Sequence, residues 1–246
     1  IDTRALTLKI RDHGTMKGML ISTAQQRNIE GFVKRIQQTP HPDTDNLVAG
    51  VSCKKIITYK SRCKKKVVLI DCGVKRSIIK NLRRYATVFQ VPYDVDQNTI
   101  DEFRPDGIVI SNGPGNPEHP EIVAATVKTV KSILDKYPVM GICLGNQILS
   151  IALGFKTYKM KFGHRGSNHG VKNLSNNKVY ITSQNHGYAI EEKNVPEIEI
   201  SWVNVNDHTV EGIRHKRLPV SSVQFHPEAG PGPYDTTFLF RDFLNA

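Results

Sequence analysis

Cysteine is scarce in this sequence. Its 246 residues include four cysteines, at irregular spacing and with no Cys-x-x-Cys pair. This pattern argues against a disulfide framework and lacks the paired spacing of zinc sites. We therefore expect reduced thiols in a cytosol-like compartment, with Cys53, Cys63 and Cys72 in structural roles.

Long apolar runs are also missing. No stretch approaches the roughly 20 apolar residues that cross a bilayer. The opening residues 1–4 show neither an initiator methionine nor the basic-then-apolar pattern of a signal peptide. We expect a soluble, cytoplasmic protein whose N-terminal part is missing from this sequence, and an organellar address in that part stays open.

Acidic residues are fewer than basic ones. The sequence has 23 Asp and Glu and 34 Lys and Arg, which gives a net charge of +11. Such an excess raises the question of a polyanionic partner. One short stretch without acids concentrates the basic residues Lys54, Lys55, Lys60, Arg62, Lys64, Lys65 and Lys66. Since no aromatic ladder or nucleic-acid motif accompanies them, we interpret the stretch as a solvated connector, with a basic nucleic-acid-binding surface as the alternative.

Residues 1–62 differ in pattern from the rest of the chain. Asp2 is a suitable N-cap for a helix that ends at Gly14. A second helical pattern covers residues 22–38. We expect two short helices and the basic connector, as the end of a smaller N-terminal domain, followed by a larger domain over residues 63–246.

In the larger domain, short apolar strands first alternate with helical patterns. Strands are expected at 67–70, 87–91, 107–110 and 138–142, and helices at 77–82 and 121–136. Such alternation indicates a parallel sheet covered on both faces. Strand-like segments follow at 156–162, 179–182, 198–205, 210–214 and 220–225, and then a helix from about residue 236. The fold class is therefore α/β: a doubly wound open sheet, mostly parallel, with an antiparallel extension.

One strand end carries a cysteine in an unusual setting. The segment Gly141–Gly145 (Gly-Ile-Cys-Leu-Gly) follows an apolar strand and opens a helical pattern. This is the cysteine form of a nucleophile elbow, in which small flanking residues let the nucleophile project from a strained turn. The helix N-terminus favours the thiolate. Cys143 is our candidate nucleophile, with a buried structural cysteine as the alternative.

A second strand end carries His226-Pro227-Glu228. A nucleophilic thiol needs a base, and a carboxylate beside that base fixes the imidazole tautomer and supports its positive charge. We therefore expect His226 and Glu228 to complete a triad with Cys143. The alternative is an ordinary His-Pro turn.

A third strand end leads into residues 111–117 (Ser-Asn-Gly-Pro-Gly-Asn-Pro). Its glycines allow backbone N–H groups to approach a ligand closely, as an oxyanion hole requires. Alone, the segment is only a turn signal. A different group, His164, Arg165 and His169, lacks soft ligands and a matching carboxylate spacing, so we expect a loop or subunit contact there and no metal site.

Taken together, these motifs resemble those of the triad-type class I glutamine amidotransferases. Two further segments, residues 159–169 and 183–188, resemble the small, glutamine-hydrolysing subunits of carbamoyl phosphate synthetases in particular. The cysteine and histidine motifs alone would also fit other glutaminases of the class. The resemblance covers essentially the whole chain, and residues 2–7 are similar to the end of that family's N-terminal domain.

The resemblance implies roles for individual residues. Cys143 would be the nucleophile, His226 the general base and acid, and Glu228 its orienting carboxylate. The oxyanion hole would consist of the backbone amides of Gly113 and Leu144. Glutamine would be bound by Gly113, Gly115, Leu144, Gln147, Asn185, Gly187 and Tyr188. The sequence departs from many relatives at one position, because Asn146 stands where they have histidine.

The implied activity is hydrolysis of L-glutamine to glutamate and ammonia through a cysteinyl thioester. Ammonia would pass to a large synthetase subunit, either a separate chain or a fusion, for carbamoyl phosphate synthesis in the pyrimidine and arginine pathways. No cofactor is expected in this chain; ATP, Mg and bicarbonate are expected on the partner, and no P-loop motif is present. Neither nucleic acid nor membrane is an expected partner. The alternatives are another class I glutaminase, a stand-alone γ-glutamyl hydrolase, a catalytically silent homologue, or a basic nucleic-acid-binding protein.

Overall fold

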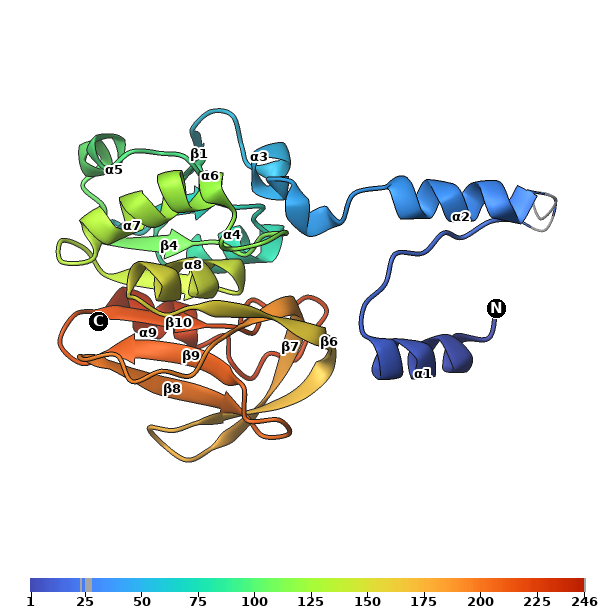
Figure 1. Ribbon diagram of the computed structural model, residues 1–246. Coiled ribbons are helices and arrows are strands. Elements are labelled where there is room, and N and C mark those ends of the chain that lie inside the picture. The colour runs from blue at the N-terminus through green and yellow to red at the C-terminus, as the bar shows by residue number, and fades with distance from the viewer. Residues whose placement is uncertain (23, 25–27, 246) are drawn as a thin grey trace.

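The computed structural model describes residues 1–22, 24 and 28–245, and these form a ten-stranded sheet with an N-terminal arm (Figure 1). The strand order is β1-β3-β2-β4-β5-β10-β9-β7-β6-β8. The strands are β1 Ile57–Tyr59, β2 Lys66–Asp71, β3 Thr87–Pro92, β4 Gly107–Ile110, β5 Val139–Ile142, β6 Thr157–Asn173, β7 Val179–Ile190, β8 Ile198–Asn204, β9 Val210–His215 and β10 Val220–Val223.

Five neighbouring strands, β3, β2, β4, β5 and β10, run parallel. In this half of the sheet Val68 pairs with Ile108, and Val139 pairs with Val220. The strands are short and apolar because both faces are covered, and β2 is buried along five of its six residues. The predicted doubly wound sheet is confirmed.

Alternate residues of the parallel strands enter two separate hydrophobic cores. Val68 and Ile70 of β2 belong to one core with residues of α5, α7 and α8, whereas Val67 and Leu69 belong to the other with residues of α4 and α9. The helices that accompany the sheet are α3 Leu47–Val51, α4 Arg76–Leu82, α5 Gln97–Phe103, α6 Pro120–Ile122, α7 Lys128–Ile133, α8 Leu144–Ala152 and α9 Leu239–Asn245. The helix predicted at 121–136 is observed as α6, a π-helical stretch Val123–Val127, and α7.

The antiparallel extension is larger than the sequence pattern predicts. The strands expected at 156–162 and 179–182 are β6 and β7, which form one long hairpin from residue 157 to residue 190. The register shifts between Lys159 and His164 and again between Gly166 and His169. Because these irregularities interrupt the alternation of inward and outward side chains, the polar middle of β6 lacked a strand signal.

The N-terminal arm lies apart from the sheet in Figure 1. Its first helix, α1 Thr3–His13, begins at the predicted cap, where the side chain of Asp2 accepts a hydrogen bond from the amide of Ala5 at 2.9 Å. The second, α2 Ile29–Gln38, is shorter than the predicted 22–38, of which residues 23 and 25–27 lie outside the described part. After α1, the amide of Thr15 donates to the carbonyl of Lys161, which joins the arm to β6.

The basic connector is not merely a solvated link. Its Ile57–Tyr59 segment is β1, which pairs antiparallel with β3 at the edge of the sheet. The β-branched and aromatic side chains of this segment favour a strand. Just before it, Val48 of α3 is fully buried in one of the cores. The placement of the domain boundary after residue 62 stays a prediction. Among the described residues, no helix has both the length and the apolar character to cross a membrane.

Candidate active site

Cys143 occupies a strained turn between β5 and α8. Its φ of 55° lies in the left-handed region that side chains other than glycine rarely adopt. The turn is tight: a Cβ on Gly145 would overlap the carbonyl oxygen of Ile110, and one on Gly141 would lie 2.5 Å from the carbonyl oxygen of Gly145. The sequence therefore needs glycine on both sides of the cysteine because a neighbouring backbone occupies the space.

The elbow places the cysteine sulfur at the N-terminus of α8. Leu144 is the first residue of this helix, so its amide lies in the first turn, where no intrahelical acceptor exists. The partial positive charge of the helix N-terminus stabilises a negative charge on Cys143. Its side chain is 4 % exposed and lines a cavity.

His226 and Glu228 follow β10 and face each other. The Nδ1 atom of His226 lies 2.7 Å from Oε1 of Glu228, and the amide of His226 donates to the carbonyl of Ser183. Since a carboxylate only accepts, Nδ1 carries the proton of this hydrogen bond, and Nε2 is the ring nitrogen left for Cys143. The structure thus brings all three predicted triad residues together.

The electrostatic surroundings favour a protonated His226. Burial alone would lower the pKa of its imidazole, but the negative charges of Cys143 and Glu228 outweigh burial and raise the pKa to about 10. The arrangement therefore supports an imidazolium at His226 beside the sulfur of Cys143. In contrast, burial raises the pKa of the Cys72 thiol well above its usual range and that of Cys53 to about 12, so these two remain thiols.

A lysine that the sequence analysis did not single out lies beside the triad. Nζ of Lys75 is 3.5 Å from Oε1 of the fully buried Glu228, and it donates to the carbonyl of Ala229 at 2.5 Å. Its positive charge compensates part of the cost of burying the carboxylate. The residue precedes α4, far from the triad in sequence, so no local motif marks it.

Gly113 brings the 111–117 loop against the elbow. A Cβ on this glycine would overlap the carbonyl oxygen of Cys72 and lie 2.8 Å from Cδ2 of Leu144, so a larger residue would push the loop away. The neighbouring Asn112 holds the loop, because its Oδ1 accepts from the amide of Lys75 at 3.0 Å. The predicted oxyanion donors, the amides of Gly113 and Leu144, therefore belong to segments in direct contact.

A cavity of about 420 Å³ lies between these segments and β7, within the size range of small-molecule sites. The predicted site residues that line it are Gly113, Gly115, Cys143, Gln147, Asn185, Gly187, Tyr188 and His226. Leu144 and Glu228 are buried beside it. The sequence analysis assigned no binding role to five further lining residues, Gly73, Asn112, Pro114, Arg165 and His186. Four of these five residues lie in segments that the sequence pattern had marked, namely 111–117, 159–169 and 183–188. Gly73 lies in no such segment.

Asn146 does not line the cavity. It is fully buried, its Nδ2 donates to Oε1 of Gln224 at 3.0 Å, and its Oδ1 accepts from the hydroxyl of Ser222 at 2.6 Å. Gln147, next in the chain, donates to the same Gln224 oxygen and to the carbonyl of Tyr188. The asparagine at position 146, where many relatives have histidine, therefore contributes to the packing of α8 against β10. It does not face the cavity of the triad.

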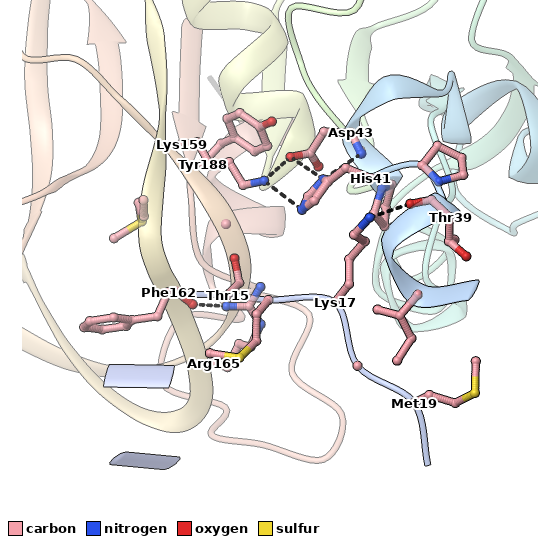
Figure 2. A pocket seen from close by; sticks show the side chains of 18 of the residues that line it. Thr15, Lys17, Met19, Thr39, His41, Asp43, Lys159, Phe162, Arg165 and Tyr188 are labelled. Carbon is pink, nitrogen blue, oxygen red and sulfur yellow. Dashed lines mark hydrogen bonds and ion pairs between the residues drawn. The ribbon is translucent and has the colours of Figure 1, made fainter. Parts of the chain in front are cut away.

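A second cavity, of about 660 Å³, lies between the arm and β6 and shares Gly115, Arg165, Gly187 and Tyr188 with the first. Figure 2 shows Asp43 between Lys159 and His41 on its wall, with Tyr188 nearby. Burial and the nearby carboxylate of Asp43 raise the pKa of Tyr188. Tyr188 thus lines both cavities.

One group of described residues has the composition of a metal site. His164, His186 and Glu211 each offer a ligand atom within 4.8 Å of the others, and all three are buried. Both ring nitrogens of His186 are already engaged, however, at 2.7 Å from the carbonyl of Tyr188 and 2.7 Å from Oε1 of Gln184. A metal ligated by this histidine would have to displace one of these contacts.

Comparison with known proteins places the chain in a family. Residues 68–246 match the family model "Glutamine amidotransferase class-I". The carbamoyl phosphate synthase small chain of Methanopyrus kandleri is 49% identical over 249 residues, which cover 99% of this chain and 68% of that protein. The small chain of Methanocaldococcus jannaschii is likewise 49% identical, over 99% of this chain and 70% of that protein.

The fold has a solved counterpart. The crystal structure of a GMP synthase component from Thermoplasma acidophilum, described as putative, is 26% identical, with a TM-score of 0.63 over 74% of this chain and 92% of that one. This structural similarity covers about three quarters of the chain, whereas the similarity to the small chains in sequence extends over nearly all of it. The chain therefore belongs to the class I glutamine amidotransferases and, among them, to the small-chain family of carbamoyl phosphate synthases.

Proposed function

We propose that this chain hydrolyses the side-chain amide of L-glutamine with Cys143 as nucleophile, His226 as general acid and base, and Glu228 as the carboxylate that orients His226. The observation that carries this proposal is the elbow itself. It holds Cys143 at positive φ at the N-terminus of a helix, and Cys143 lines the same cavity as His226. Nδ1 of His226 contacts the buried carboxylate of Glu228, which leaves Nε2 for the cysteine.

In the first half of the reaction, the Cys143 thiolate attacks the amide carbon of glutamine. The carbonyl oxygen becomes an oxyanion, and the amides of Gly113 and Leu144 stabilise it. The tetrahedral intermediate then collapses: the carbon–nitrogen bond breaks, and the His226 imidazolium gives its proton to the leaving nitrogen. The products of this half are ammonia and a γ-glutamyl thioester on Cys143.

In the second half, water replaces ammonia beside His226. The neutral imidazole takes a proton from this water as it attacks the thioester carbon, and a second oxyanion forms in the same place. Collapse breaks the carbon–sulfur bond, which releases glutamate and restores the thiolate. Glu228 supports the imidazolium each time it forms, which is the role its 2.7 Å contact permits.

Among the residues that line the cavity, which include Arg165, we assign the recognition of glutamine to a set of uncharged groups. Gly115, Gln147, Asn185, Gly187 and Tyr188 line it and supply amide side chains and backbone groups. Such groups donate and accept hydrogen bonds without adding a charge that would compete with the triad. Since the Asp43 carboxylate acts on the Tyr188 hydroxyl from the side of the arm, we assign the contribution of Tyr188 to its backbone and ring.

Membership in the small-chain family suggests which protein receives the ammonia. We propose that the ammonia passes to a large synthetase subunit that uses ATP, Mg and bicarbonate to make carbamoyl phosphate, and that this chain needs no cofactor of its own. The thiolate and histidine mechanism supports the second statement, because every proton and electron pair it requires comes from these residues, glutamine and water.

The experiment that tests the proposal measures ammonia release from glutamine by the full-length protein and its Cys143→Ala variant, each with and without the large subunit. We expect loss of release in the variant, and stimulation of the native protein by the large subunit. Release that ignores the large subunit would contradict the assigned partner. Release that survives the substitution would contradict the nucleophile.

A further inference from the structure

A pair of buried charged residues lies behind the cavity, outside the triad. Nδ1 of His164 in β6 is 3.4 Å from Oε1 of Glu211 in β9, and their side chains are 8% and 0% exposed. On the other side of the imidazole, Nε2 lies 2.8 Å from Oδ2 of Asp207. Asn204 donates to Oε1 of Glu211 at 3.0 Å. A histidine between two carboxylates, almost out of water, makes a charged pair whose two members depend on each other.

The surroundings of His164 favour its charged form. Burial alone would lower the pKa of His164, but Glu211 and Asp207 outweigh burial and raise it. Nδ1 of His164 and Oε2 of Glu211 form no hydrogen bond with any described residue, so charge attraction rather than a directional hydrogen bond links the two side chains. Removing the charge of His164 would leave Glu211 buried without an opposite charge, and removing the charge of Glu211 would leave His164 with the partly exposed Asp207 as its carboxylate contact.

His164 contacts the segment that lines the glutamine cavity through His186. The two rings are perpendicular, with centroids 4.9 Å apart. Burial lowers the pKa of His186 to about 4, so this ring is neutral and carries one proton. Its Nδ1 donates that proton to the carbonyl of Tyr188 at 2.7 Å, because a carbonyl only accepts. The unprotonated Nε2 then accepts from the side-chain amide of Gln184, whose amide nitrogen must face the ring. The same carbonyl accepts from Gln147 at 3.0 Å.

The backbone ladder alone does not hold this part of the hairpin. Between the two register shifts of β6 and β7, the pairing comprises His164 with His186, Arg165 with Asn185, and Gly166 with Gln184. A short ladder between two irregularities is a weak restraint on strand position. Side-chain contacts at His164 therefore add to the restraints on Asn185, Gly187 and Tyr188 where they face the cavity.

We propose that His164 and Glu211 are positioning residues for glutamine: as a buried ion pair, they hold residues 185–188 in their binding geometry through the ring of His186. This inference rests on the proposed function, since it assumes that glutamine binds in the cavity lined by these residues. A metal site built from the same cluster is the competing interpretation. The occupied nitrogens of His186 favour the ion pair.

The test compares three variants of the full-length protein in glutamine hydrolysis. Glu211→Gln keeps the size of the side chain and an oxygen for Asn204 but removes the negative charge. We expect its KM for glutamine to rise about tenfold while kcat changes by less than about twofold. The double variant His164→Gln/Glu211→Gln removes both charges, and we expect its KM to lie closer to that of the native protein.

The third variant, Arg214→Gln, is the matched control. It breaks an exposed ion pair with Glu199 that joins the neighbouring strands β8 and β9. We expect its KM to equal that of the native protein. A merely structural role for Glu211 would instead lower kcat through loss of folded protein and leave KM unchanged, and thermal unfolding of each variant measures that loss independently.

Three results would overturn the inference. The first is an unchanged KM in Glu211→Gln, and the second is a double variant whose KM is no closer to that of the native protein than the KM of Glu211→Gln. The third is one zinc ion per purified native chain that is lost in Glu211→Gln and whose removal by a chelator reproduces the defect of that variant. A different result would show that the proposed function itself is wrong. In that case neither the native protein nor Arg214→Gln would show glutamine hydrolysis that depends on Cys143.

Discussion

Nδ1 of His226 lies 2.7 Å from Oε1 of Glu228, a residue two positions further along the chain. Pro227 separates them and limits the backbone between base and carboxylate. Lys75 lies 3.5 Å from the same carboxylate oxygen. One oxygen of the carboxylate is thus contacted by both groups, and the imidazole keeps Nε2 for the cysteine.

This contact predicts a moderate defect for Glu228→Gln. An amide cannot support the imidazolium, but a thiol ionises far more readily than a serine hydroxyl and depends less on its base. We expect kcat for glutamine hydrolysis to fall about tenfold, less than the roughly 10⁴-fold loss seen when a serine triad loses its carboxylate. Steady-state kinetics measures the effect, and an unchanged kcat would contradict the role given to Glu228.

The same pair predicts how stability depends on pH. In the unfolded chain an imidazole titrates near about 6.5. In the folded protein, burial opposes protonation of His226, yet Cys143 and Glu228 raise its pKa to about 10. Between these values the folded state holds a proton that the unfolded chain releases, so the contribution of His226 is complete below about pH 6.5 and is lost as the pH rises towards about 10.

Glu228→Gln removes one of the two negative charges that raise the pKa of His226. We therefore expect its free energy of unfolding to fall less steeply than that of the native protein across this pH range. Urea denaturation of both proteins at several pH values measures the two slopes. Parallel curves would show that Glu228 does not raise the pKa of His226.

The elbow predicts a stability defect for Gly145→Ala. A Cβ there would overlap the carbonyl oxygen of Ile110, so β4 or α8 must shift, and we expect a loss of about 3 kcal/mol. Gly50→Ala is the control, because a Cβ at this helical glycine has no atom within 4 Å. It should leave stability unchanged or raise it by up to about 1 kcal/mol. Equal effects of the two substitutions in urea denaturation would contradict this account of the turn.

We expect the substitution Asn146→Ala to lower the stability of the protein without changing the rate of the reaction. Replacing Asn146 by alanine leaves Ser222 without its acceptor and removes one donor to Gln224, all in a fully buried place. We expect the free energy of unfolding to fall by about 1–3 kcal/mol. At a temperature where the variant is folded, kcat should stay within about twofold, because the side chain does not line the cavity. A large loss of kcat in fully folded protein would place Asn146 in the chemistry.

The parallel half of the fold was predictable because each element has its own local signal. β2, β4 and β5 are short apolar runs buried on both faces. The Cys143 and His226 motifs were predictable for the same reason, since each combines a strand end with a distinctive short sequence. In these places local pattern and tertiary structure agree.

The long hairpin and the surroundings of the triad were not predictable in this way. β6 crosses two irregularities that break its alternation, so only its first residues carried a strand signal. Lys75, just before α4, and Glu211 in β9 reach their partners through tertiary packing, and neither is close in sequence to the residue it contacts. Charge pairs of this kind depend on the sheet order, which local sequence does not encode.

Within the small-chain family, the central claim is that glutamine hydrolysis passes through a thioester on Cys143. The most direct measurement is acid quenching of the full-length protein during turnover of isotopically labelled glutamine, followed by peptide mapping. We predict that label is recovered on the peptide containing Cys143 and that Cys143→Ser yields no thioester there. Turnover at the native rate with label on another residue, or with none on any peptide, would contradict the account.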